Sequence, residues 1–132
     1  MSIFADTSAF YAMLDTNDTH HKEAGDAWLS FASRKPQVAC TNYVLLETFA
    51  LVQHRLGMHA VRTMQEDIVP VLGIIWIDAE AHHAAVQAIL TAGRRQLSLV
   101  DCTSFDAMRR LGIRTAFTFD PHFAEQGFEC VP

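Results

Sequence analysis

The sequence has little of what marks secreted or membrane proteins. Three cysteines, Cys40, Cys102 and Cys130, are odd in number and widely spaced, so they suggest neither a disulfide framework nor a zinc ribbon. The longest charge-free apolar stretch, 68–77, is about half a membrane span and contains a proline. The first residues lack the basic segment of a signal peptide. We therefore expect one soluble, cytoplasmic domain spanning residues 1–132, with no membrane contact.

Lysine is also scarce. The two lysines, Lys22 and Lys35, both come early, whereas phosphotransfer receiver domains and aspartate-nucleophile phosphatases need a lysine late in the chain. The net charge of −5 argues against a general nucleic-acid binder. Half of the ten basic residues nevertheless gather between positions 94 and 114, namely Arg94, Arg95, Arg109, Arg110 and Arg114.

Strand-like and helix-like segments alternate along the chain. Hydrophobic periodicity and turn residues predict strands at 2–6, 38–40, 70–77, 115–119 and 128–132, and helices at 8–15, 21–33, 41–57, 58–69, 78–93, 102–111 and within 120–127. Strands joined by helices form parallel sheets that carry helices on both faces. The sequence therefore predicts a three-layer α/β/α sandwich around a central, mostly parallel sheet of about four to five strands.

Two acids directly follow predicted strands. Asp6 comes after the apolar "IFA", and Asp120 comes after "TAFTF". In parallel sheets, ligands bind beyond the carboxyl ends of the strands. Asp6 has no evident local structural role, because Ser8 is well placed to cap the next helix. Asp120 is equally explained as a turn residue.

Two further acids are candidates for the same crevice. Glu47 lies on an apolar stripe of the helix "NYVLLETFALV", although a position at the margin of that stripe, paired with an arginine, is an equal alternative. Asp101 opens a predicted helix, where helix capping alone would explain it. Asp106 lies about 140° further round that helix and should face elsewhere.

A convergence of these four carboxylates would need compensation. Each pair at about 4 Å costs roughly 4 kcal/mol at an effective dielectric near 20, so protons or cations must offset the repulsion. Oxygen ligands alone favour Mg²⁺ or Mn²⁺ over zinc. Two such ions among carboxylates are the arrangement used for in-line attack on a phosphodiester.

Four segments of the sequence resemble the motifs of a known family. They are "FADTSAF", "NYVLLETFAL", "LSLVDCTSFDAMRRLGI" and "AFTFDPHF", in this order between about Ile3 and Val131. They are similar to the motifs of PIN-domain ribonucleases, in particular the VapC-type toxins of toxin–antitoxin pairs. The resemblance implies an α/β/α fold with an acidic pocket for Mg²⁺ or Mn²⁺. It also implies a metal-dependent endoribonuclease that leaves 5′-phosphate and 3′-hydroxyl ends.

The resemblance also implies residue roles. The family's catalytic and metal-binding acids fall on Asp6, Glu47, Asp101 and Asp120. Asp6 and Asp101 would be the principal ligands, Asp120 would complete the set or act through water, and Glu47 would hold a second ion or orient the attacking water. Candidates for substrate binding are Ser8, Thr118, Arg94, Arg95 and Arg109. The hydroxyls of Ser8 and Thr118 would hydrogen-bond either the acids or a phosphate. Helix capping by Ser8 and a solubilising role of the arginines stay open as alternatives.

Histidines and partners complete the sequence-based expectations. None of the seven histidines has metal-ligand spacing, so we interpret them as surface residues. His122 is the exception, because the match places it beside the pocket, although a turn role explains it better. The resemblance implies an RNA substrate, a cognate antitoxin protein and a homodimer. The alternative is a non-catalytic PIN-like RNA-binding or regulatory module, against which the four intact acids argue.

Overall fold

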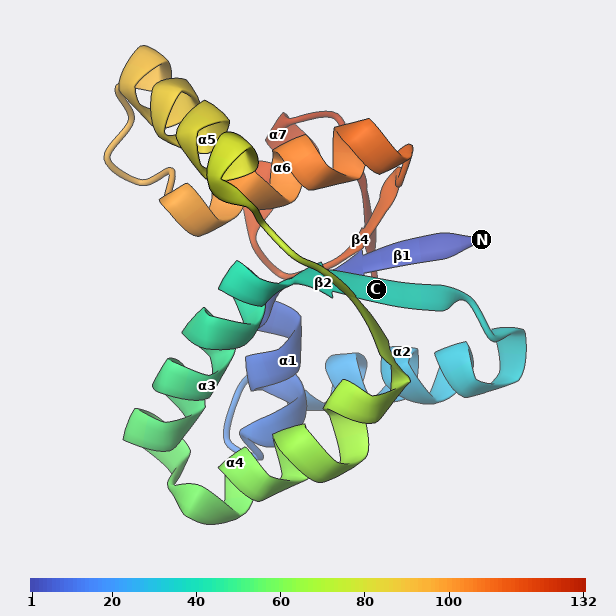
Figure 1. Ribbon diagram of the computed structural model, residues 1–132. Helices are drawn as coiled ribbons and strands as arrows, with labels where there is room; N and C mark the ends of the chain where they lie inside the picture. Colours follow the sequence, from blue (N-terminus) through green and yellow to red (C-terminus); the bar gives the residue numbers. More distant parts are fainter.

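A computed structural model describes residues 1–132 and contains five β-strands and seven α-helices (Figure 1). The strands are β1 (Ser2–Ala5), β2 (Gln37–Thr41), β3 (Leu72–Ile75), β4 (Thr115–Phe117) and β5 (Glu129–Val131). The helices are α1 (Thr7–Leu14), α2 (His21–Arg34), α3 (Asn42–Leu56), α4 (Met58–Thr63), α5 (Ala79–Ala92), α6 (Leu99–Leu111) and α7 (Pro121–Glu125). None of these helices combines the length and the apolar composition that crossing a bilayer requires.

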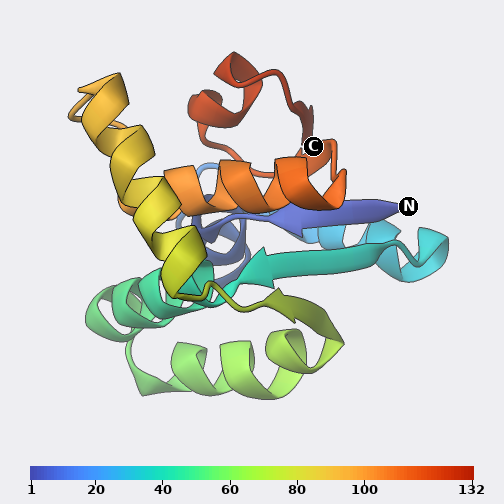
Figure 2. The ribbon, with the colours of Figure 1, turned by 45° about the horizontal axis from the view of Figure 1, so that its top comes forward.

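The strands form one sheet in the order β3-β2-β1-β4-β5, and every neighbouring pair is parallel. Helices α1 to α4 lie on one side of the sheet, and α5 to α7 lie on the other (Figures 1 and 2). The predicted three-layer α/β/α sandwich is therefore confirmed. The strand order changes direction between β1 and β4, and ligand crevices of open parallel sheets lie at such a switch point.

Aromatic side chains on both faces of the sheet hold the layers together. Phe4 of β1 faces Phe123 of α7, with ring centroids 6.4 Å apart. On the opposite face, Phe117 of β4 meets Phe31 of α2 edge-on at 5.2 Å. Both faces are buried, so β1 is apolar at every position from Ile3 to Ala5 instead of alternating with polar residues. This packing fixes the carboxyl ends of β1 and β4 side by side.

Several predicted element boundaries were wrong; the strands predicted to end at positions 77 and 119 end at Ile75 and Phe117, and the α-helix predicted to end at position 69 ends at Thr63. Two of the errors have a clear local cause. The strand predicted from position 70 begins at Leu72, because Pro70 lies in a short 3₁₀ turn, Val69–Val71, that follows a π-helical turn. Proline has no N–H to donate to the sheet, so the strand starts after it. The helix predicted from Cys102 already begins at Leu99, because Ser98 caps it. Its end was predicted correctly: Gly112, with a φ of 68°, adopts the left-handed conformation that favours glycine after a helix.

Candidate metal centre

Asp6 stands at the junction of β1 and α1. Its backbone N–H donates to Phe117 O of β4 at 3.0 Å, which ties the end of β1 to the neighbouring strand. Its side chain caps α1 by accepting the backbone N–H of Ser8. The expectation that Ser8 caps this helix and that Asp6 has no local role was therefore wrong. An N-cap residue has an extended backbone, and its side-chain oxygen accepts the backbone N–H of the residue two or three positions later. Asp6 meets both conditions.

Two hydroxyl groups fix the Asp6 carboxylate. Ser8 Oγ donates to Asp6 Oδ2 at 2.9 Å, and Thr118 Oγ1 donates to the same oxygen at 3.2 Å. Each hydroxyl is itself held by a backbone N–H of the segment after β4, from Phe119 to Ser8 Oγ and from Asp120 to Thr118 Oγ1, both at 2.9 Å. Of the two roles expected for these hydroxyls, contact with an acid or with a phosphate, the structure shows contact with an acid.

Asp101 and Asp120 also begin helices. Ser98 and Asp101 form a capping box, in which Asp101 N–H donates to Ser98 Oγ at 3.0 Å and Ser98 N–H donates to Asp101 Oδ2 at 3.1 Å. Asp101 is therefore in the first turn of α6, three residues after the cap. Asp120 caps α7 by accepting the His122 N–H at 2.9 Å. The three acids thus lie at helix N-termini along one edge of the sheet, where the positive ends of the helix dipoles favour negative charge.

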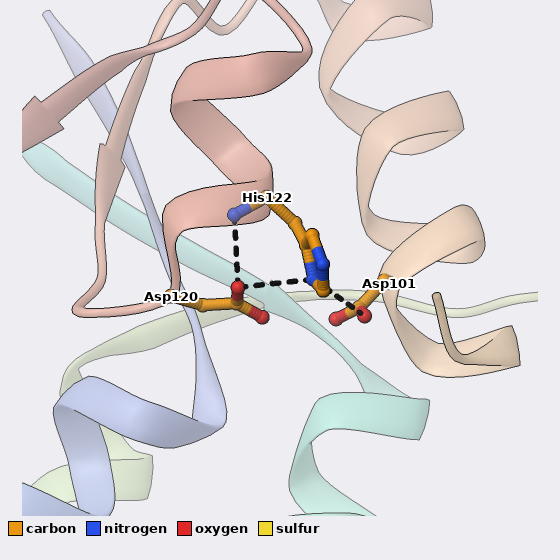
Figure 3. Close-up of side chains that lie close together, drawn as sticks. All are labelled: Asp101, Asp120 and His122. Atoms are coloured by element: carbon orange, nitrogen blue, oxygen red, sulfur yellow. Dashed lines mark hydrogen bonds and ion pairs between the residues drawn. The ribbon is translucent and has the colours of Figure 1, made fainter. Parts of the chain in front are cut away.

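The His122 ring lies between the two acids on α6 and α7 (Figure 3). Its Nδ1 is 3.1 Å from Asp120 Oδ1 and 3.9 Å from Asp101 Oδ2. The ligand atoms of these three residues all lie within 4.8 Å of one another, which suits a single cation. The sequence favoured a turn role for His122. The resemblance also placed His122 beside the pocket, and the structure places its ring next to Asp101 and Asp120.

Burial and repulsion from neighbouring carboxylates make Asp6 and Asp101 costly to ionise. Burial raises the pKa of Asp6 from 3.8 to about 6, the hydrogen bond from Ser8 opposes this rise, and the charges of Asp101 and Asp120 add to it. Burial likewise raises the pKa of Asp101, with repulsion from Asp120 adding to the effect and His122 opposing it. Three acids that influence one another in this way form one electrostatic unit. A bound cation would relieve that strain.

Neither of the remaining acids, Glu47 and Asp106, shares a hydrogen bond or an ion pair with this group. Glu47 is half-buried on α3, and its carboxylate makes neither an ion pair nor a hydrogen bond. Its predicted arginine partner is therefore absent. Helix α3 packs against α6, so Glu47 belongs to an element that borders the acids. Asp106 pairs with Arg110 at 2.9 Å on the outer part of α6.

The candidate arginines differ in whether their guanidinium groups already have a partner. Arg94 pairs with Glu125 of α7 at 3.2 Å. Arg109 donates to Gln126 Oε1 at 2.7 Å and lies over the Phe128 ring. Arg95 is exposed and makes no ion pair, in the loop that leads to the Ser98 cap. Of the three, only Arg95 could contact a phosphate without first giving up a partner.

Comparison with known proteins identifies the family. A family model for the PIN domain matches residues 3–129. The chain belongs to the PIN-domain family. The 23S rRNA-specific endonuclease VapC20 of Mycobacterium tuberculosis is 35% identical over 127 residues, which cover 96% of this chain and 95% of that protein.

Solved structures share this PIN-domain fold. The crystal structure of Mycobacterium tuberculosis VapC20, described as a sarcin-ricin loop cleaving toxin, has a TM-score of 0.86 at 34% identity and covers 98% of this chain and 99% of its own. VapBC2 from Rickettsia felis, bound to a promoter DNA fragment, has a TM-score of 0.72 at 13% identity and covers 98% and 97%. FitAcB from Neisseria gonorrhoeae has a TM-score of 0.69 at 16% identity and covers 98% and 96%. The last two show likeness of fold alone.

Replacing Ser8 with alanine tests the hydroxyl support in this PIN domain. The Ser8→Ala variant removes one donor to Asp6 and leaves the Phe119 N–H without its acceptor. We expect a loss of about 1 kcal/mol in stability and roughly a tenfold loss in metal affinity. Thermal melts and calorimetric Mn²⁺ titration would measure both. Ser30→Ala, which removes a hydroxyl bonded to Ala27 O on α2, should leave Mn²⁺ affinity unchanged. Unchanged affinity in Ser8→Ala would contradict the assigned role.

Proposed function

We propose that this chain is a Mg²⁺- or Mn²⁺-dependent endoribonuclease that acts as the toxin of a toxin–antitoxin pair. The observation that carries the proposal is the close group of Asp101, Asp120 and His122, whose ligand atoms lie within 4.8 Å of one another, together with Asp6 at the end of β1, which feels the charges of both acids. Buried carboxylates that repel one another suit a hard divalent cation. The 35% identity with an rRNA endonuclease along nearly the whole chain supports RNA as the substrate.

The free oxygens of the three acids fit a divalent cation. Each carboxylate engages one oxygen with the protein, namely Oδ2 of Asp6, Oδ2 of Asp101 and Oδ1 of Asp120. The second oxygen of each has no hydrogen-bond partner, and none of the three is shut off from solvent. Carboxylates that are oriented through one oxygen and open at the other are pre-organised for metal binding.

In the proposed mechanism the chain's own residues position the reacting groups. A divalent cation bound here would stabilise negative charge on the scissile phosphate and acidify a water for attack. Asp6 and Asp101 are the principal ligands, held by the Ser8 and Thr118 hydroxyls and by the capping box. Glu47, which has no other partner, orients the attacking water or holds a second ion.

The proposed substrate is a structured ribosomal RNA. VapC20 is described as cleaving the sarcin-ricin loop, and we propose the same loop of 23S rRNA as the first target to test. Arg95 contacts a phosphate next to the scissile one. Arg94 and Arg109 contact phosphates further along the RNA after exchanging Glu125 and Gln126 for it, since Arg109 is about 12 Å along α6 from Asp101. A cognate antitoxin and a second copy of the chain are the proposed protein partners. Large exposed apolar side chains support such contacts, among them Leu29, Leu46 and Trp76.

Ribosome cleavage tests this proposal. The purified chain is incubated with intact bacterial ribosomes and Mn²⁺, and primer extension along 23S rRNA maps any new 5′ ends. We expect a single cut within the sarcin-ricin loop and 5′-phosphate ends. Cuts at other positions would support the proposed nuclease activity and contradict the proposed target. Tight RNA binding without any cut in ribosomes, free rRNA or tRNA would instead support the non-catalytic RNA-binding module.

A further inference from the structure

His122 Nδ1 is the only buried side-chain nitrogen or oxygen that lacks a hydrogen-bond partner. It lies 3.1 Å from Asp120 Oδ1, yet the pair does not have hydrogen-bond geometry. An orphaned buried polar atom costs about 1–3 kcal/mol, so such atoms call for an explanation. The His122 side chain is 16% exposed, and its unpartnered nitrogen faces the two acids (Figure 3).

We infer that His122 Nδ1 is a direct ligand of the divalent ion, beside Asp101 and Asp120. The inference rests on the proposed metal dependence and goes further by assigning a nitrogen ligand and a metal preference. Ligand atoms at about 2.1 Å from an octahedral ion are about 3.0 Å apart when adjacent and about 4.2 Å apart when opposite. The distances of 3.1 Å to Asp120 Oδ1 and 3.9 Å to Asp101 Oδ2 fall within that span. Both oxygens also accept a backbone N–H, so the ion would share them with the helix caps or bind the second oxygen of the same carboxylates.

The local fold keeps the imidazole in place. His122 is in the first turn of α7, and its backbone N–H donates to Asp120 Oδ1. This bond holds the Asp120 carboxylate close to the residue that carries the ring. The next residue, Phe123, is fully buried and packs edge-on against Phe105 of α6 at 4.9 Å. This contact joins α7 to the helix that carries Asp101. The two helices therefore present a nitrogen and two carboxylates as a preformed set.

A nitrogen ligand changes which ion the site prefers. Mg²⁺ favours oxygen ligands alone, whereas imidazole favours first-row transition ions. The site should therefore bind Mn²⁺ more tightly than Mg²⁺, by roughly tenfold or more. An all-carboxylate site would discriminate less between the two ions.

Pulsed electron paramagnetic resonance of bound Mn²⁺ tests the inference without RNA. A directly coordinated imidazole gives a ¹⁴N coupling to Mn²⁺, which we expect in the full chain and expect to vanish in both His122→Ala and His122→Asn. The exposed His83 on α5 provides the control, since His83→Ala should retain the coupling. Thermal melts establish that the variants fold.

Competition between Mg²⁺ and Mn²⁺ gives the second readout. His122→Ala should lose roughly tenfold in Mn²⁺ affinity and far less in Mg²⁺ affinity. Bound Mn²⁺ without a ¹⁴N coupling would overturn the His122 assignment and leave the proposed nuclease intact. An absence of Mn²⁺ binding altogether would overturn both.

Discussion

Changing Asp101 to asparagine should reduce RNA cleavage on the order of a thousandfold or more. Asp101 is 8% exposed and supplies one of three carboxylates that converge on the proposed metal. Asparagine keeps an oxygen that can accept the Ser98 N–H, so the capping box and the start of α6 survive. The substitution therefore removes the negative charge and spares the fold. Single-turnover cleavage of rRNA in Mn²⁺ measures the effect.

Asp106→Asn is the matched control on the same helix. Asp106 pairs with Arg110 on the outer part of α6, and exposed pairs of this kind contribute about 0–1 kcal/mol. Its cleavage rate should stay within about twofold of the unmodified chain. Equal rates in Asp101→Asn and in the unmodified chain would refute a catalytic role of the acid.

The Asp6→Asn variant should be more stable than the unmodified chain at neutral pH when metal is removed. Burial raises the pKa of Asp6 from 3.8 to about 6, so the folded state binds this proton more tightly than the unfolded state. The contribution of Asp6 to the free energy of unfolding therefore falls as the pH rises from about 4 to about 6. Above that range, Asp6 lowers the stability by the full cost of ionising it in the folded state. A rise of this size corresponds to about 3 kcal/mol.

Urea unfolding in EDTA at several pH values measures this effect. The difference in unfolding free energy between Asp6→Asn and the unmodified chain should grow from pH 4 to about 6 and then level off. Asparagine still offers an oxygen to the hydroxyls of Ser8 and Thr118. If the stability of Asp6→Asn relative to the unmodified chain is lower at pH 7 than at pH 4, ionisation of Asp6 does not destabilise the folded state.

The sequence predicted the fold well because local patterns were clear. Apolar strands alternate with helices, and Gly112 ends α6 as predicted. The failures come from tertiary or short-range polar interactions. Ser98 was not recognised as a cap because the capping box joins it to an acid that was interpreted as the cap itself. The late start of β3 follows from a 3₁₀ turn that periodicity does not reveal.

The candidate site was predicted in part. Strand ends indicated Asp6 and Asp120, because parallel strands bring their carboxyl ends to one edge. The resemblance predicted that the Ser8 and Thr118 hydroxyls contact the acids or a phosphate, but it could not say which acid, since Thr118 is 112 residues from Asp6 in the chain and meets it only in the folded sheet. The position of the His122 ring depends on α7 packing against α6. The metal-binding and catalytic roles of Asp6, Glu47, Asp101 and Asp120 all remain predictions.

The most direct test of the account is cleavage of ribosomal RNA by protein stripped with EDTA, before and after addition of Mn²⁺. If the carboxylates of Asp6, Asp101 and Asp120 work by holding a divalent ion, stripped protein should give no product. Added Mn²⁺ should restore cleavage in the unmodified chain and in Asp106→Asn, and it should fail to do so in Asp101→Asn. Cleavage that continues undiminished in EDTA would contradict the central claim.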